Sequence, residues 1–539
     1  MFSYFFILGN NPALSVAEIL NKFQPKKYSL INKEVFRVEF EKKIDEQKVI
    51  KKLGGTVKLA MIKEPVSAEA TPRQAISNEI TNNKLQITRL AKATPRRANK
   101  LQNSKVQTSI KEKNHKPQNF SFDKDLKGQA MGNKIPAEPR KNSEELLGAV
   151  EKYLPEKFEG KYKFGFSFYG ESSSRGGYSK NSHGEEFNLK KLAMDIKREL
   201  KAREISCRWI TSKGNNLSSV VVAKNKMIDR GQEFIVVTGQ GKKYLGITKA
   251  VQDFEELSFR DYNRPARDSQ SGMIPPKLAQ MMLNIGLQGR VTIPDYPSYD
   301  KAIISAKSSK NFITLAEARA SKIISQGDSA GVKNLSQNSD LSLQKDNTKQ
   351  SPTDQVLLDP FCGSGTILME AMLLGVQDVI GVDVSEKAVK NTRKNLEWVQ
   401  ERFNLSKKNS FEVRVGNAVK LAGIIKEGSV DVIVTEPYLG PQKKAGNIEK
   451  VKKDLEVLYT GAIREFRKIL KPGGRVVMVW PVLRGAKNSF MNPKIEGFKI
   501  VSQIPGDLKG VESTDRGTIV YGRRGQRVWR EITTLEKAS

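Results

Sequence analysis

Residues 430–441, VDVIVTEPYLGP, end an apolar run in side chains that can do chemistry. Residues 432–434 are typical of a buried strand in a parallel sheet, and strand pairing must end at Pro437 because proline has no N–H to donate. A rigid turn that carries a carboxylate and an aromatic ring directly after a buried strand favours ligand binding. We therefore predict that a ligand binds at Thr435, Glu436, Pro437 and Tyr438.

A glycine-rich loop follows an earlier apolar run. Residues 359–366 read DPFCGSGT and lead directly into a predicted helix. Glycines let the backbone approach a ligand closely, and the first turn of a helix offers unpaired N–H groups and positive potential. This arrangement suits a carboxylate or a phosphate, although the loop has neither the Gly-Lys-Ser/Thr of a P-loop nor the G-x-G-x-x-G of a dinucleotide fold. The predicted cofactor contacts are Asp359, Phe361, Gly363, Gly365 and Thr366.

Two further polar side chains end the next predicted strands. Asp383 lies 24 residues after Asp359, a spacing that matches an acid accepting hydrogen bonds from ribose hydroxyls. Asn417 follows the third strand, where an amide can read an adenine edge. Taken alone, a glycine turn is often only a tight connection and a lone Asp often only a helix cap. Together, the three features favour S-adenosylmethionine over a nucleotide phosphate as the cofactor.

These side chains depend on a series of strands that alternate with helices. The apolar runs VLLDP, DVIGVD, FEVRVG, VDVIVTE and GRVVMVW have strand length and are separated by helical stretches. Such alternation, with strands that are apolar throughout, predicts a parallel sheet covered on both faces. Ligands of these sheets bind at the carboxyl ends of the strands. The sequence therefore predicts an α/β, Rossmann-like catalytic domain over residues 355–539.

The rest of the chain divides into ordered and biased segments. Residues 1–63 have short strands around a helix, and residues 142–250 have helices among several strands, so both are predicted to be small α+β domains. Residues 251–287 are predicted to be a linker and a helix on the cofactor side of the catalytic domain. Residues 64–141 are basic and residues 288–354 are of low complexity, so we predict that both are disordered insertions.

Composition narrows the choice of partners. The net charge is +33, from 92 Lys and Arg against 59 Asp and Glu, which favours a polyanion such as nucleic acid as the partner. Two cysteines and two histidines cannot build a disulfide framework or a Cys/His zinc site, so we predict no metal. No apolar run approaches the roughly 20 residues of a membrane span. We expect a cytoplasmic protein that does not bind a membrane; the sequence predicts no oligomeric state.

The segment LLDPFCGSGTILMEA and the Pro-Tyr turn resemble class I methyltransferases that modify exocyclic amines. More narrowly, the chain resembles the THUMP-containing tRNA guanine-N2 methyltransferases, which are related to the methylase domains of large-subunit rRNA guanine-N2 methyltransferases. The resemblance extends to LGGTVKLA, RDYNRPARDSQSGMIPPKLAQMMLN and GTIVYGRRGQRVWREI. It implies a ferredoxin-like domain, a THUMP domain and a class I methyltransferase domain. It also implies S-adenosylmethionine as cofactor, tRNA as partner and the N2 amine of guanosine as target.

The catalytic turn departs from the pattern of that family. There the fourth strand ends in Asp/Asn-Pro-Pro-Tyr/Phe, in which the first side chain and the next carbonyl accept hydrogen bonds from the target amine. The resemblance implies that the Thr435 hydroxyl and the Glu436 carbonyl take these roles here. The Glu436 carboxylate then replaces the missing acid or takes the proton after transfer. Tyr438 is expected to stack on the target base.

Other functions stay open from the sequence. A DNA adenine-N6 or cytosine-N4 methyltransferase uses the same catalytic turn, although the THUMP-like segment argues against it. An rRNA guanine-N2 methyltransferase is a further enzyme alternative. A non-catalytic RNA-binding protein with a degenerate methyltransferase fold is favoured only by the Thr-Glu pair in place of Asp-Pro.

Overall fold

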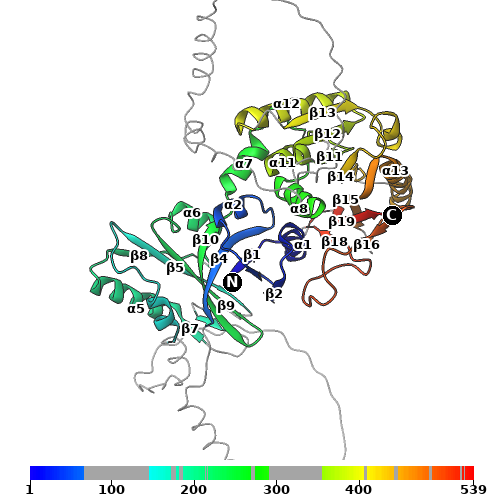
Figure 1. Ribbon diagram of the computed structural model, residues 1–539. Coiled ribbons are helices and arrows are strands. Elements are labelled where there is room, and N and C mark those ends of the chain that lie inside the picture. Colours follow the sequence, from blue (N-terminus) through cyan, green and yellow to red (C-terminus); the bar gives the residue numbers. More distant parts are fainter. Residues whose placement is uncertain are drawn as a thin grey trace, which may run out of the picture.

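The structure is a computed structural model that describes most of residues 1–65, 145–289 and 355–538. The undescribed positions within these ranges are 171–177, 181–185, 213, 215, 269–272, 406–408, 442–446, 485–487, 523, 524 and 527. The two predicted insertions lie almost entirely outside the described residues, so their disorder stays a prediction. The described chain is organised around two large sheets (Figure 1).

The first sheet has eight strands in the order β2-β3-β1-β4-β10-β9-β5-β8. The strands are β1 (Phe2–Leu8), β2 (Lys27–Asn32), β3 (Val35–Phe40), β4 (Thr56–Pro65), β5 (Tyr162–Tyr169), β8 (Cys207–Trp209), β9 (Gly231–Gly239) and β10 (Lys242–Val251). The accompanying helices are α1 (Pro12–Phe23), α2 (Glu46–Lys51), α5 (Leu189–Ala202) and α6 (Ser219–Lys224). A separate hairpin pairs β6 (Tyr178–Lys180) with β7 (Glu186–Asn188).

This sheet joins the two segments that the sequence analysis separated into small domains. β4 of the N-terminal segment pairs antiparallel with β10 of the middle segment. A buried polar group crosses the junction: Lys58 in β4 forms an ion pair with Glu233 in β9, and both side chains are almost fully buried. The Glu233 carboxylate also accepts hydrogen bonds from Thr248 Oγ1 (2.6 Å) and Ser167 Oγ (2.5 Å). The sequence did not predict this pairing, because it brings together residues on either side of a long insertion.

The second sheet has nine strands, with seven in the order β13-β12-β11-β14-β15-β19-β17. They are β11 (Val356–Asp359), β12 (Asp378–Asp383), β13 (Ser410–Val415), β14 (Val430–Thr435), β15 (Leu470–Arg484), β17 (Phe498–Ile500) and β19 (Val528–Lys537). Two short strands, β16 (Asn488–Ser489) and β18 (Ile519–Tyr521), pair with β15 and β19. The pairs from β13 to β15 are parallel, and β19 is antiparallel to β15. This order is that of the Rossmann-like class I methyltransferase fold, so the predicted fold is confirmed.

Helices cover both faces of this sheet, as its apolar strands require (Figure 1). Side chains of α8 (Pro276–Leu287), α11 (Thr366–Leu374) and α12 (Glu386–Arg402) share one core with alternate residues of β11 and β14, such as Leu357 and Val434. The 3-10 helix η1 (Ala418–Gly423) and α13 (Ile448–Ile469) share the other core with Leu358 and Ile433. The helix α7 (Phe254–Tyr262) leads from the first sheet toward α8. No helix of the described residues is long and apolar enough to cross a membrane.

A buried carboxylate fastens the N-terminal segment to the catalytic domain. Glu18 of α1 is fully buried and accepts hydrogen bonds from the N–H groups of Gly54 and Gly55, both at 2.8 Å. Asn284 of α8 donates from Nδ2 to Glu18 Oε1 (2.8 Å) and to the Lys52 carbonyl (2.7 Å). Burial raises the pKa of Glu18 to about 7, and these donors counteract that effect. The predicted linker helix is therefore an interface element that packs on both α1 and the second sheet.

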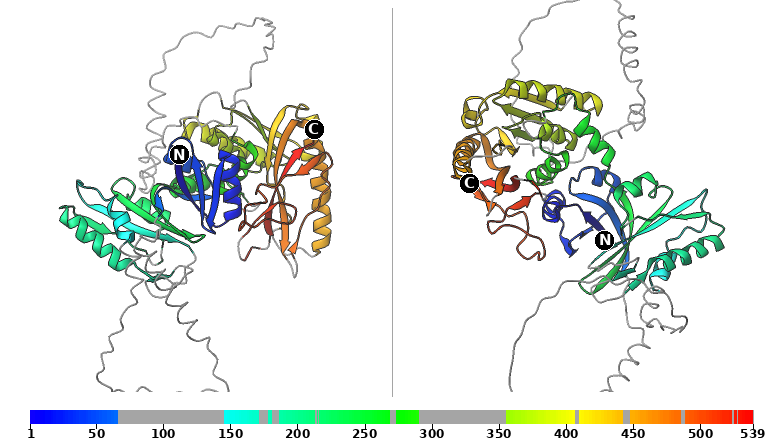
Figure 2. Two further views of the ribbon diagram at one scale, coloured as in Figure 1. Left: turned by 60° about the horizontal axis from the view of Figure 1, so that its bottom comes forward. Right: turned by 180° about the vertical axis from the view of Figure 1, so that it is seen from behind.

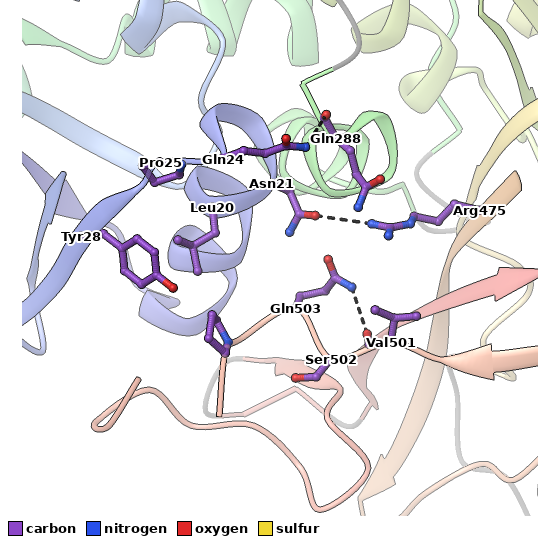
Figure 3. A pocket seen from close by; sticks show the side chains of 11 residues that line it. Leu20, Asn21, Gln24, Pro25, Tyr28, Gln288, Arg475, Val501, Ser502 and Gln503 are labelled. Atoms are coloured by element: carbon purple, nitrogen blue, oxygen red, sulfur yellow. Dashed lines mark hydrogen bonds between the residues drawn. The ribbon is translucent and has the colours of Figure 1, made fainter. Parts of the chain in front are cut away.

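A second polar contact between the same parts borders a cavity of about 400 Å³ (Figure 3). Arg475, the sixth residue of β15, donates from Nη1 to Asn21 Oδ1 of α1 (3.4 Å). Gln24 donates from Nε2 to the carbonyl of Gln288, just after α8 (3.0 Å). Arg475 is in register with Val432, three residues before β14 ends at Thr435, so it does not lie at the carboxyl ends of the strands.

We expect Asn284→Ala to lower the free energy of unfolding by about 2–4 kcal/mol, because it removes two buried hydrogen bonds and leaves a small cavity. Urea denaturation measures the loss. The matched control is Gln47→Ala. It removes one exposed hydrogen bond from the side-chain amide to the Lys249 carbonyl and should cost less than about 1 kcal/mol. Equal losses in the two variants would show that the Glu18 network does not hold the interface together.

Candidate active site

The candidate site lies at the carboxyl ends of β11, β12 and β14. β11 pairs in parallel with β12 on one side and with β14 on the other. The chain runs outward from β11 in opposite directions on these two sides, which makes this edge the topological switch point of the sheet. The predicted cofactor loop and the predicted catalytic turn therefore meet at one place, although 76 residues separate Asp359 from Thr435.

The loop after β11 is built around two glycines with positive φ. Gly363 has φ +54°, and a Cβ placed there would meet no described atom within 4 Å, so this side of the loop is open. Gly365 has φ +81° and is the N-cap of α11, where a Cβ would lie 2.8 Å from Thr392. No side chain of the described residues caps α11, so N–H groups of its first turn remain available. The loop thus has the open backbone that ligand binding requires, and its contact with a cofactor stays a prediction.

Asp383 shapes this loop with both of its carboxylate oxygens. The N–H of Gly363 donates to Oδ2 and the N–H of Ser385 donates to Oδ1, both at 2.9 Å. The side chain is only half-buried, so the oxygens retain lone pairs on the exposed side. Asp383 can therefore orient the loop and also accept hydrogen bonds from a ligand.

Acidic groups gather at this edge of the sheet. Asp359 is 2% exposed, and burial raises the pKa of its carboxyl to about 7. The nearby charges of Asp383 and Glu436 raise this pKa further, whereas hydrogen bonds from Thr435 and the Phe361 N–H lower it. A group of acids favours a cationic ligand and repels a phosphate. The electrostatics thus agree with the preference for a sulfonium cofactor over a nucleotide.

The side chains of Thr366 and Phe361 are less accessible than expected for residues in direct contact with a ligand. Thr366 is 5% exposed, and its hydroxyl accepts a hydrogen bond from Arg264 Nη1 at 2.6 Å. Phe361 is partly buried against the core that contains α13. Asn395 of α12 fastens the same segment by donating to the carbonyls of Ala266 and Ser364. Arg264 and Asn395 are structural supports of the loop that the sequence analysis missed.

Two exposed valines lie at the ends of β12 and β13, beside the predicted ribose site. Asp383 of β12 is in register with Val415 of β13, and Val415 and Val384 are 50% and 67% exposed. Exposed apolar side chains beside the ribose-binding candidate can line a slot for a planar base, and the sequence analysis did not identify them. Asn417 is exposed, but its Oδ1 accepts a hydrogen bond from the Val419 N–H and caps η1. Its Nδ2 is then left to read an adenine as a donor, and Oδ1 keeps one further lone pair.

The catalytic turn differs in part from what was expected. Thr435 is fully buried, and its hydroxyl donates to Asp359 Oδ1 at 2.7 Å. In this geometry the hydroxyl has no exposed surface from which to accept a hydrogen bond from a target amine, so the role predicted for Thr435 stays a prediction that its burial does not support. Thr435 instead ties β14 to β11 and joins the turn to the cofactor loop.

The rest of the turn presents an aromatic ring and a paired carboxylate. Tyr438 is 59% exposed, and its carbonyl accepts a hydrogen bond from Tyr459 Oη of α13 at 2.6 Å. This anchors the backbone of the turn while the Tyr438 ring stays open to solvent. The Glu436 carboxylate does not point into solvent, because Arg530 of β19 donates to it from Nε (2.5 Å) and Nη2 (3.5 Å). Pro437 is buried and stiffens the turn between these two side chains.

Comparisons with known proteins give relatives for the catalytic block. Residues 347–504 match the family described as an RMKL-like methyltransferase domain. The chain is 35% identical over 125 residues to the tRNA (guanine(10)-N2)-dimethyltransferase of Methanothermobacter thermautotrophicus, covering 23% of this chain and 32% of the relative. It is 36% identical over 100 residues to the probable enzyme of that name from Methanothermococcus thermolithotrophicus, covering 18% of this chain and 58% of the relative.

The chain thus spans between about a third and somewhat over half of the length of these relatives. Among solved structures, it is similar to the crystal structure of TrmN from Thermus thermophilus, at 14% identity with a TM-score of 0.43 over 100% of both chains. The matched segment includes both the DPFCGSGT loop and the TEPY turn. Residues 347–504 are therefore similar to an RMKL-like methyltransferase domain, and part of the chain is similar to proteins named as tRNA (guanine(10)-N2)-dimethyltransferases.

Proposed function

We propose that the protein transfers a methyl group from S-adenosylmethionine to the exocyclic N2 amine of a guanosine in tRNA. The observation that carries this proposal is the hydrogen bond from Thr435 to Asp359, which joins an acidic, glycine-rich loop to a turn with an exposed aromatic ring. The matched methyltransferase family supports the reaction class. The names of the relatives support tRNA guanosine as the substrate.

The residues of the loop suit S-adenosylmethionine. This cofactor supplies a methyl group activated by a positively charged sulfur. Asp359 and Asp383 provide negative potential for its cationic groups, and the open N–H groups of α11 suit its carboxylate. Asp383 is placed to accept hydrogen bonds from ribose hydroxyls, and Val384 and Val415 to line the adenine. Asn417 is the candidate donor to the adenine edge.

The catalytic turn suits a conjugated amine. The nitrogen of an exocyclic amine is a poor nucleophile because its lone pair is delocalised into the base. A carbonyl that accepts a hydrogen bond from the amine pulls the nitrogen toward a pyramidal form, and positioning lowers the remaining barrier. With Thr435 buried, the acceptors at this turn are the carbonyl and the carboxylate of Glu436. Tyr438 provides the platform on which an unpaired or flipped base can stack.

RNA as the substrate agrees with the charge of the chain. A net charge of +33 favours a polyanionic partner, and contacts to phosphates supply affinity without reading sequence. The eight-stranded sheet with its helices is the candidate RNA-binding part, since it is fastened to the catalytic domain through Glu18 and Asn284. The THUMP character of this part is carried over from the family resemblance.

Nucleoside analysis tests the proposed function. The full chain is incubated with S-adenosylmethionine and, in separate reactions, with tRNA, ribosomal RNA and duplex DNA. We expect N2-methylguanosine or its dimethyl form from tRNA. Methylated adenine or cytosine in DNA would replace this function by the DNA alternative, and cofactor binding without any methylated nucleoside would favour a non-catalytic RNA-binding protein.

We expect Asp383→Ala to weaken S-adenosylmethionine binding by about 1.5–3 kcal/mol, because ribose hydroxyls lose an ionised acceptor. Isothermal titration calorimetry measures this change directly. The matched control is Asp378→Ala at the opposite end of the same strand, where the carboxylate bonds only to Ser410 among the described residues. Unchanged affinity in a folded Asp383→Ala protein would remove the ribose assignment.

Cofactor affinity should also depend on pH through Asp359. Its pKa is raised from 3.8 to about 7 in the ligand-free fold, so its contribution to stability is present at low pH and is lost as pH rises through about 7. A cationic ligand requires the ionised form, so affinity should increase between about pH 6 and about pH 8. In Asp359→Asn, calorimetry should show weaker binding with a flatter pH profile. The midpoint temperature of thermal unfolding should fall less for this variant than for the wild-type protein as pH rises from about 4 to about 7. Identical profiles for the two proteins would exclude Asp359 as the titrating group.

A further inference from the structure

We propose that Glu436 and Arg530 together read the Watson–Crick edge of the target guanine, and so determine that guanine, not adenine, is methylated. This inference rests on the proposed function. It starts from the ion pair between these side chains, which joins the catalytic turn after β14 to strand β19, 94 residues later in the chain. An ion pair could serve a general structural role at many places. Here the carboxylate belongs to Glu436, directly after the buried Thr435 and two positions before the exposed stacking candidate Tyr438.

The two side chains of this ion pair are mostly buried but still accessible to a ligand. The Glu436 and Arg530 side chains are 11% and 15% exposed, so each keeps a small accessible surface. Arg530 is positioned by strand pairing, opposite Pro481 of β15 and Tyr521 of β18. The pKa values of Asp359 and of Tyr459 are both raised in part by the charge of Glu436, which places this carboxylate close to the cofactor loop and to the turn. A base stacked on Tyr438 would thus have the pair within its reach.

The hydrogen-bonding capacity of the pair is only partly used. A carboxylate offers about four lone-pair sites, and Arg530 occupies two of them. Of the guanidinium nitrogens, Nε and Nη2 donate to Glu436, and Nη1 has no acceptor among the residues that the structure describes. The pair can therefore offer two acceptors and one donor side by side to a ligand without breaking.

This pattern is complementary to guanine. Along its Watson–Crick edge, guanine presents an acceptor at O6 and donors at N1–H and at the N2 amine. The Glu436 carboxylate can accept from N1–H and N2–H, while Arg530 Nη1 donates to O6. Adenine presents an amine donor and the N1 acceptor instead, which would place donor against donor and acceptor against acceptor. A site built of buried polar groups rejects such a mismatch strongly, because its groups are left unpaired.

The same contacts serve the reaction. One hydrogen of the N2 amine is held by the Glu436 carboxylate and the other can be held by the Glu436 carbonyl, so a single residue supplies both acceptors that activate the nitrogen. In the family pattern, the first side chain of the turn supplies one of them. Here that side chain is Thr435, which is buried and engaged with Asp359, so the carboxylate one position later takes its place.

The test compares guanosine with 2,6-diaminopurine at the nucleotide that the wild-type enzyme methylates. The analogue keeps the target amine at C2, but its N1 is an acceptor and its C6 carries an amine donor. We expect the kcat/KM of the wild-type enzyme to be at least about tenfold lower for tRNA carrying the analogue. In Glu436→Gln, the ratio of kcat/KM for guanosine to kcat/KM for the analogue should fall toward one. The control Glu536→Gln, at the far end of β19 in a more exposed ion pair with Lys499, should keep the wild-type ratio.

A double variant separates recognition from stability. Glu436→Arg combined with Arg530→Glu keeps an ion pair at this position but reverses the order of donors and acceptors, so it should bind cofactor and lose the preference for guanosine. A ratio near one for the wild-type enzyme, or a wild-type ratio in a folded Glu436→Gln protein, would overturn the inference and leave the proposed function standing. Failure of the wild-type enzyme to methylate any guanosine would overturn the proposed function itself, and the inference with it.

Discussion

The hydrogen bond between the Thr435 hydroxyl and the Asp359 carboxyl joins the two strands on either side of the switch point. Because both residues are buried, this bond is shielded from water, and its loss would leave a buried carboxyl with one partner fewer. It fixes where the turn after β14 stands relative to the loop after β11. Methyl transfer requires a constant distance between a cofactor at the loop and a base at the turn, and this hydrogen bond helps to hold that distance.

A second constraint acts between the two sheets. Glu18, the N–H groups of Gly54 and Gly55, and Asn284 form one buried polar group in which each donor has an acceptor. Removing a partner from such a group costs more than an exposed contact, so the N-terminal segment and α8 are expected to move together. Since α8 also packs on β14 and β15, the candidate RNA-binding part is fastened to the sheet that bears the candidate active site (Figure 2).

The active-site turn shows how one departure from a family pattern can alter several neighbours. A threonine at the end of β14 is short enough to be buried and to bond to Asp359, which removes it from the ligand surface. A glutamate in the next position carries a charge that proline could not, and Arg530 of the antiparallel strand neutralises it. Compared with the pattern of the family that the sequence resembles, the acid stands one residue later in the turn, and the charge that balances it comes from the C-terminal strand.

The sequence alone determined the Rossmann-like domain, because strand-length apolar runs alternating with helices leave few other arrangements, and the glycine loop and Asp383 fall where such folds bind ligands. It also singled out Tyr438, whose ring the structure leaves exposed. Tertiary structure alone decided that β4 pairs with β10, that Thr435 is buried, and that Glu436 faces Arg530. The first two outcomes depend on which strands become neighbours and how deeply a strand end is covered. The ion pair brings together residues 94 positions apart. Local sequence patterns record the period and polarity of one element at a time, so contacts of this kind appear only once the sheet has been assembled.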